Sequence, residues 1–166
     1  EVLLIGDRDT RGLGGPTRSD VVPDPDEPTD FTSFAFDMGR DPSRAVGGGT
    51  YGFGKAVLYL ASKVSTVGMY TQVRTSSGQI EPRFMILSVA ERAADHGKRY
   101  TGRHWWGERD PDLPGAVAPI VGPEARDLAH SLGMDRYLHP LDTGTTLAIL
   151  APHNPFATAD EESDGE

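Results

Sequence analysis

Apolar residues along the chain gather in short runs, and long polar stretches rich in glycine and proline separate them. The run Val2–Ile5 ends at Gly6 and Asp7, which is typical of a buried strand. The segment "TVGMYTQVR" (66–74) alternates between apolar and polar positions and predicts a half-buried strand. After the turn "TSSGQ", the segment "EPRFMILSVA" (81–90) predicts its antiparallel partner, and "GTTLAILAP" (144–152) predicts a last strand that proline ends.

Two further segments predict helices. Residues 55–65 are apolar nearly all round, which indicates a helix buried inside a domain. In "GPEARDLAHSLG", Pro123 suits the first helical position, Glu124 the first turn, and Gly133 the position beyond the helix end. The segment "FTSFAFDMG" (31–39) fits a strand or a helix equally well. This order of elements, with adjacent antiparallel strands and two helices, predicts an α/β domain built in two layers.

Composition places this pattern in a single domain. The chain has 166 residues, and its 20 glycines and 13 prolines predict long loops, of which 95–119 holds both tryptophans. No cysteine is present, so disulfides and thiolate metal sites are excluded. We expect a folded domain over residues 1–156 and an acidic, disordered tail over 157–166.

The charge and hydropathy of the chain indicate which kinds of partner and which cellular compartment to expect. The formal net charge of −9 argues against non-specific attraction to nucleic acid or to anionic membranes, so nucleic acid is expected only indirectly or through other domains. No apolar run approaches the roughly 20 residues of a membrane span, and no signal peptide is visible. We therefore expect a cytoplasmic protein. The chain opens at Glu1 on a strand already in progress, which suggests a piece of a longer protein.

The stretch "GGGTYGFGKA" (47–56) is followed by an apolar helix pattern, and this combination is typical of a phosphate-binding loop. Backbone N–H groups at a helix N-terminus attract phosphate, and glycine lets the backbone approach it closely. A Walker-type P-loop fits Gly49, Gly54 and Lys55, but Ala56 stands where a hydroxyl should bind Mg²⁺. A dinucleotide fingerprint over 47–52 lacks a strand before it, and a turn that merely connects two elements is a further alternative.

The rest of the chain adds a fourth interpretation. With "VLLIGDRDTRGLGGP" (2–16) as a first glycine box, "GGGTYGFGKA" as a second, and "GTTLAILAP" as a Gly-Thr strand, the chain resembles the GHKL ATPases. This group includes gyrase, the heat-shock chaperone, histidine kinases and the mismatch-repair ATPase. The segment "YGFGKAVLYLASKVSTVGMYTQ" is most similar to bacterial mismatch-repair and microrchidia-type members. The resemblance implies a Bergerat-type fold, a two-layer α/β sandwich with a mixed, largely antiparallel sheet.

The resemblance also implies roles for residues near the base. Asp7 would accept the adenine amino group, and Thr10 and Gly12 would line the base and ribose. Thr145 would bond near the adenine, directly or through water. The box departs from the family pattern D-x-G-x-G, since Asp9 stands where the first glycine is usual and the glycines come later.

For the phosphates, Lys55 would pair with the β- or γ-phosphate, and a lid of backbone N–H groups would come from Gly47, Gly48, Gly49, Gly52 and Gly54. The resemblance places the Mg²⁺-holding asparagine and the water-activating glutamate on a helix upstream of Glu1. No metal ligand or catalytic residue is therefore expected within this chain. The implied cofactors are ATP and Mg²⁺. The implied activity is ATP binding and hydrolysis by a homodimeric parent in DNA-associated or phage-defence work. By itself, this chain is expected to bind ATP weakly or not at all and to be inactive. The alternatives are an interaction domain without turnover and a divergent P-loop NTPase.

Overall fold

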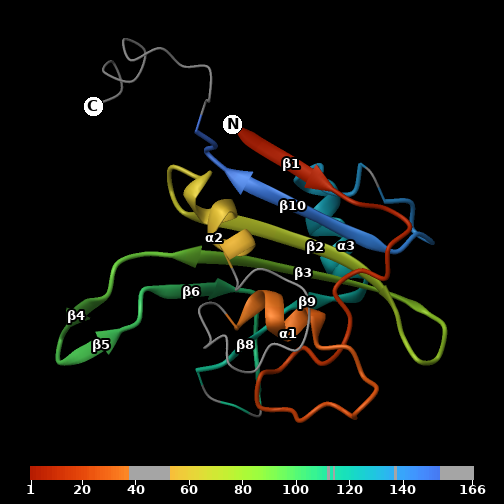
Figure 1. The fold of residues 1–166 in the computed structure, drawn as a ribbon, viewed down its shortest axis with the longest axis horizontal. Coiled ribbons are helices and arrows are strands. Elements are labelled where there is room, and N and C mark those ends of the chain that lie inside the picture. Colours follow the sequence, from red (N-terminus) through yellow and green to blue (C-terminus); the bar gives the residue numbers. More distant parts are fainter. Residues whose placement is uncertain (38–52, 112, 114, 137, 154–166) are drawn as a thin grey trace.

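The computed structural model describes residues 1–37, 53–111, 113, 115–136 and 138–153. The boundary expected between residues 156 and 157 lies outside the described residues. Three helices and ten strands are described (Figure 1). In chain order they are β1 (Val2–Gly6), α1 (Asp30–Ala35), α2 (Phe53–Leu60), β2 (Thr66–Arg74), β3 (Ile80–Val89), β4 (Ala93–Asp95), β5 (Lys98–Tyr100), β6 (Arg103–Trp106), β7 (Glu108–Arg109), β8 (Val117–Ala118), β9 (Ile120–Val121), α3 (Gly122–Ser131) and β10 (Gly144–Leu150).

Six of the strands form one sheet. Its order is β1-β10-β2-β3-β6, with β9 also paired to β3, and each described pairing is antiparallel. The strands β2 and β3 form the hairpin expected from the sequence, with Met69 opposite Met85. The last strand, β10, lies between β1 and β2, so the first and last strands of the chain are neighbours in the sheet. The protein is thus a mixed α/β fold with an antiparallel sheet.

Helices cover both faces of this sheet: Figure 1 shows α1 and α2 in front of it and α3 behind it. On the α1–α2 face, the core contains Phe31, Ala35 and Tyr59 from the helices, packed on side chains of β2 and β3. On the other face, Ala125 and Ala129 of α3 pack on a second cluster from β2, β3 and β10. The expected two-layer arrangement is therefore not confirmed, because α3 adds a layer on the second face.

The burial of two strands differs from the prediction. Strand β1 was expected to be buried, but Val2, Leu3 and Ile5 are exposed, because β1 lies at the edge of the described sheet and pairs only with β10. Strand β2 was expected to be half buried, yet Val67 through Val73 are buried on both faces. The central place of β2 and the helices on either side of it account for this difference.

The first predicted helix is displaced and shortened. It spans Phe53–Leu60 instead of residues 55–65. Beyond it, the Ser62 hydroxyl donates to the Leu150 carbonyl (2.5 Å) and accepts the Thr66 N–H (3.1 Å), so this side chain joins the segment after α2 to β10 and β2. The ambiguous segment 31–39 begins as helix α1, and the long connection 95–119 contains the short strands β5 to β8.

Candidate functional site

The centre of the candidate site is the junction between the end of β1 and the start of β10. Asp7 follows β1, and its N–H donates to the carbonyl of Thr145 (2.9 Å). The Thr145 N–H donates in return to Oδ1 of Asp7, also at 2.9 Å. This reciprocal pair joins segments 138 residues apart, as the antiparallel register of Gly6 opposite Thr146 requires.

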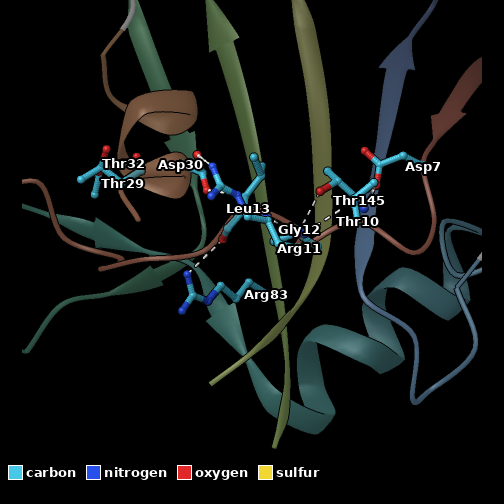
Figure 2. A network of polar contacts seen from close by, with 11 residues as sticks. Asp7, Thr10, Arg11, Gly12, Leu13, Thr29, Asp30, Thr32, Arg83 and Thr145 are labelled. Atoms are coloured by element: carbon cyan, nitrogen blue, oxygen red, sulfur yellow. Dashed lines mark hydrogen bonds and ion pairs between the residues drawn. The ribbon is translucent and has the colours of Figure 1, made fainter. Parts of the chain in front are cut away.

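Two more of the predicted residues join this pair through side-chain contacts. The Thr10 hydroxyl donates to Oδ1 of Asp7 (2.7 Å) and accepts the N–H of Gly12 (3.3 Å). Figure 2 shows Asp7, Thr10 and Thr145 close together, with Gly12 next along the loop. The structure therefore brings together four of the residues that the family resemblance places around the base, and we call Asp7, Thr10, Gly12 and Thr145 the Asp7 cluster.

Thr71 on β2 contacts this cluster through its hydroxyl group. Its hydroxyl donates to the Gly144 carbonyl (2.9 Å) and accepts the N–H of Leu13 (2.9 Å). The hydroxyl of Thr145 lies 3.0 Å from that of Thr71, and because a hydroxyl has one hydrogen, Thr145 donates in this contact. Sequence reasoning missed Thr71, since its role depends on the register that places it opposite Thr145.

Close approach of the backbone explains two glycines at the site. Gly12 has φ of +67°, and a Cβ there would lie 2.5 Å from the carbonyl oxygen of Gln72. A Cβ on Gly144 would lie 2.5 Å from the backbone oxygen of Asp7. Side chains at these positions would push the loop after β1 away from β2 and β10.

Arg83 on β3 holds the far end of the same loop. Its Nη1 donates to the carbonyls of Gly15 (2.8 Å) and Leu13 (3.2 Å), and its guanidinium lies 5.4 Å from the centre of the Phe31 ring. Figure 2 shows Arg83 reaching up to this loop from its strand. Sequence reasoning missed Arg83 as well, although a charged residue inside the apolar run "PRFMIL" was an available signal.

The loop is also tied to α1 on its other side. Arg11 donates through Nη2 to Oδ1 of Asp30, the first residue of α1, at 3.0 Å. The N–H of Phe31 donates to the Gly14 carbonyl at 2.9 Å. Polar contacts to β2, β3, β10 and α1 therefore hold the segment from Asp7 to Gly15 in one conformation.

The Asp7 carboxylate keeps one acceptor position toward solvent. Its Oδ1 accepts from Thr10 and Thr145, whereas Oδ2 has no hydrogen bond to any described residue. Asp7 is exposed, so an external donor can reach Oδ2. This free acceptor fits a group that donates one hydrogen bond to a carboxylate, as the exocyclic amino group of adenine does.

Lys55 contacts helix α1 and no residue of the Asp7 cluster among the contacts described. It stands in the first turn of α2 and donates through Nζ to the carbonyl of Ser33 on α1. Burial lowers the pKa of Lys55, and the nearby carboxylate of Asp37 raises it in part. Gly54 lies within α2, while Gly47, Gly48, Gly49 and Gly52 lie outside the described residues.

A cavity of about 190 Å³ lies elsewhere in the molecule, where Arg18 and Asp110 meet the rings of Phe36 and Trp105. Arg18 bonds Asp110 at 3.1 Å and Asp20 at 2.7 Å, so two carboxylates already face the guanidinium in this cavity. It shares no lining residue with the Asp7 cluster. Within the described ranges, no group of three or more His, Asp or Glu side chains is placed to hold a metal ion.

The comparisons with known proteins do not identify the kind of site, so only its geometry indicates it. No family model, curated protein or solved structure matches the chain. The described helices include none that is long and apolar enough to cross a membrane. The fold and site together define an α/β domain whose first loop carries an ordered carboxylate beside a Gly-Thr strand start.

Proposed function

We propose that this chain binds ATP, and that the Asp7 cluster recognises the adenine base. The observation that carries the proposal is the convergence of Asp7, Thr10, Gly12 and Thr145 in one hydrogen-bonded network, from segments distant in the sequence. Two hydrogen bonds fix the orientation of the exposed Asp7 carboxylate, and its second oxygen is open to a ligand that donates to it.

Recognition of the base follows from the chemistry of Oδ2 of Asp7. A carboxylate oxygen accepts a hydrogen bond from the 6-amino group of adenine, whereas guanine presents a carbonyl oxygen at that position. The Thr145 hydroxyl donates to Thr71, so it would contact a neighbouring ring nitrogen through a water molecule that donates to both. The site should therefore prefer adenine nucleotides over guanine nucleotides.

The phosphate part of the proposal rests on the sequence of the second glycine box. Backbone N–H groups of residues 47–54 would bind the phosphates at the start of α2, where the helix dipole favours negative charge. Lys55 donates to the Ser33 carbonyl, so its proposed phosphate contact requires the ammonium group to leave that carbonyl. Burial lowers the pKa of Lys55, and a phosphate beside its ammonium group would favour the charged form, as the carboxylate of Asp37 already does in part.

The proposal extends to a longer parent protein through the family resemblance alone. There the same site would hydrolyse ATP with Mg²⁺, and closure of the lid over nucleotide would favour a homodimer in the cytoplasm. We also propose that the sheet, the lid and the first glycine box are arranged as in a Bergerat-type fold. Helix α3, which packs on the second face of the sheet, departs from the two layers of that fold.

A second candidate function is an interaction domain that keeps the fold without binding nucleotide. One observation favours it: Oδ1 of Asp7 already accepts two hydrogen bonds within the protein, so the carboxylate has a structural role. A divergent P-loop protein is less well supported, because P-loops follow strands of parallel sheets and each described pairing here is antiparallel.

Titration of the 166-residue chain with a fluorescent ATP analogue separates these candidates. Asp7→Asn keeps the size of the side chain but removes its charge, and we expect it to weaken binding by about tenfold or more. Lys55→Ala should weaken binding of ATP more than binding of adenosine. Asp9→Asn is the matched control, because Asp9 is exposed and its side chain bonds only Arg8 among the described residues.

The contrary outcome is equally specific. Equal affinity of the unchanged chain, Asp7→Asn and Lys55→Ala for the analogue would favour the interaction domain. A preference for GTP over ATP would overturn the assignment of the site to adenine even if binding itself were strong.

A further inference from the structure

Strands β4 and β5 form a hairpin arm that projects beyond the six-stranded sheet (Figure 1). All six residues of the two strands are exposed. The two residues that join them, His96 and Gly97, have φ of +46° and +75°, which is the backbone pattern of a tight two-residue hairpin turn. The arm is thus a regular hairpin presented to solvent and continuous with β3 and β6.

The arm and its flanks differ in charge from the rest of the chain. Residues 91–109 contain five basic and three acidic residues, a net charge of +2, so the remaining residues carry −11. Arg92, Lys98 and Arg99 are exposed and form no ion pair with any described residue. Although Asp95 stands opposite Lys98 in the hairpin, these three exposed cations are open to an external anion.

Exposed aromatic rings lie on the same arm and on β6, the strand that follows it. Trp106 on β6 is 50% exposed, and its ring centre lies 6.1 Å from that of His104 with an interplanar angle of 31°. Tyr100 at the end of β5 is 46% exposed. The neighbouring Trp105 points to the other face of β6, where its Nε1 donates to the carbonyl of Ala35 (2.9 Å). Trp106 therefore has no part in the core that holds Trp105.

We propose that this arm–β6 surface, formed by Arg92, Lys98, Arg99, Tyr100, His104 and Trp106, binds single-stranded nucleic acid. The cations contact the phosphates, and the open face of Trp106 stacks on a base. An acidic protein would satisfy the cations equally well, but it would leave the exposed rings without a flat partner. The inference is independent of the nucleotide site, and it departs from the expectation that nucleic acid is bound only indirectly.

The test measures fluorescence anisotropy of a labelled oligothymidylate of about 20 nucleotides with the full 166-residue chain, at about 50 mM salt and above. Lys98→Ala/Arg99→Ala should weaken binding by about tenfold or more at the lowest salt. It should also reduce the slope of log affinity against log salt by about 1.4, since each phosphate contact on a single strand contributes about 0.7. Trp106→Ala should weaken binding by about 5- to 150-fold and leave the slope unchanged.

The matched control is Arg74→Ala/Arg136→Ala, which removes two exposed cations; Arg74 lies at the other end of the β2–β3 hairpin. Thermal unfolding by circular dichroism checks that each variant folds. Absence of binding at the lowest salt, or equal losses in the two double variants, overturns the proposal. Equal affinity for polyglutamate and oligothymidylate, with no effect of Trp106→Ala, also overturns it and assigns the surface to an acidic protein.

Discussion

Gly12 is the residue at which the loop after β1 passes closest to the sheet. Its φ of +67° lies in the left-handed region, and an added Cβ would meet both the Gln72 carbonyl (2.5 Å) and the Thr71 hydroxyl (2.9 Å). Gly78, in the turn between β2 and β3, has a similar φ of +81° but open space around it. The two glycines therefore separate the cost of backbone strain from the cost of a steric clash.

We expect Gly78→Ala to cost about 1–2 kcal/mol of unfolding free energy, from strain alone, and Gly12→Ala to cost about 2–5 kcal/mol, because the loop must also move. Urea denaturation of the two variants measures both values. Equal costs would show that the loop after β1 shifts without resistance, and would weaken the argument that Thr71 and Arg83 hold it in place.

Arg83 offers a second test at this scale. Arg83 bonds the carbonyls of Gly15 and Leu13 through Nη1 and the Glu81 carboxylate through Nε (2.8 Å), and the single ammonium of Arg83→Lys keeps the charge but cannot replace both sets of contacts. We expect a loss of about 1–3 kcal/mol in unfolding free energy and weaker nucleotide binding. Arg74→Lys, at an exposed position, should stay within about 0.5 kcal/mol of the unchanged chain. Denaturation and titration of the same samples check both effects.

At the scale of elements, α2 joins the α1–α2 core through Tyr59. Burial raises the pKa of Tyr59 to about 12 from its ordinary 10.0, and Arg103 opposes this rise only in part. Between pH 10 and pH 12 the unfolded chain releases this proton while the folded chain retains it. Stability therefore falls as the pH rises through this window, with a slope of at most about 1.4 kcal/mol per pH unit from this group.

Tyr59→Phe should remove this contribution. Its unfolding free energy should fall less steeply between about pH 10 and about pH 12 than that of the unchanged chain. Chemical denaturation at a series of pH values measures the two slopes. Parallel declines in the two proteins would mean that Tyr59 ionises in the folded chain as readily as in the unfolded one.

Local patterns predicted the type of most elements but not their burial. The β2–β3 hairpin, helix α3 and strand β10 follow from alternation, turn residues and capping signals. Strand β2 was expected to be half buried because Tyr70 and Gln72 are polar. Both are buried because the Tyr70 hydroxyl donates to Gln72, and the Gln72 amide donates to the carbonyls of His139 and Asp142. These partners lie near β10, so no local pattern indicates them.

At the scale of the whole molecule, burial decreases from the centre of the sheet to its edges. Strand β2 lies between β10 and β3 with helices on both faces, whereas β1 is an exposed edge and β4–β5 an exposed arm. We expect amide hydrogens of β2 to exchange only through global unfolding, and those of β1 and β4–β5 to exchange much sooner through local opening. Hydrogen exchange measured by mass spectrometry tests this order, and β1 amides as slow as those of β2 would contradict it.

Only part of the candidate site could be predicted, because some of its residues are brought together by tertiary structure alone. Asp7, Thr10, Gly12 and Thr145 were named from the sequence because a family resemblance supplied their relation. Thr71 and Arg83 were not named, since their contacts exist only once β2 lies beside β10 and β3. The lid glycines 47–52 and the nucleotide itself stay predictions.

The two consecutive tryptophans of β6 have a practical consequence as optical reporters. Trp105 is tucked against Phe36, with ring centres 6.0 Å apart, while Trp106 faces water on the opposite side of the strand. Emission from a chain carrying only the first should be blue-shifted and resist acrylamide, and emission from a chain carrying only the second should be red-shifted and easily quenched. One strand can thus signal separately the integrity of the interior and the occupancy of the outer surface.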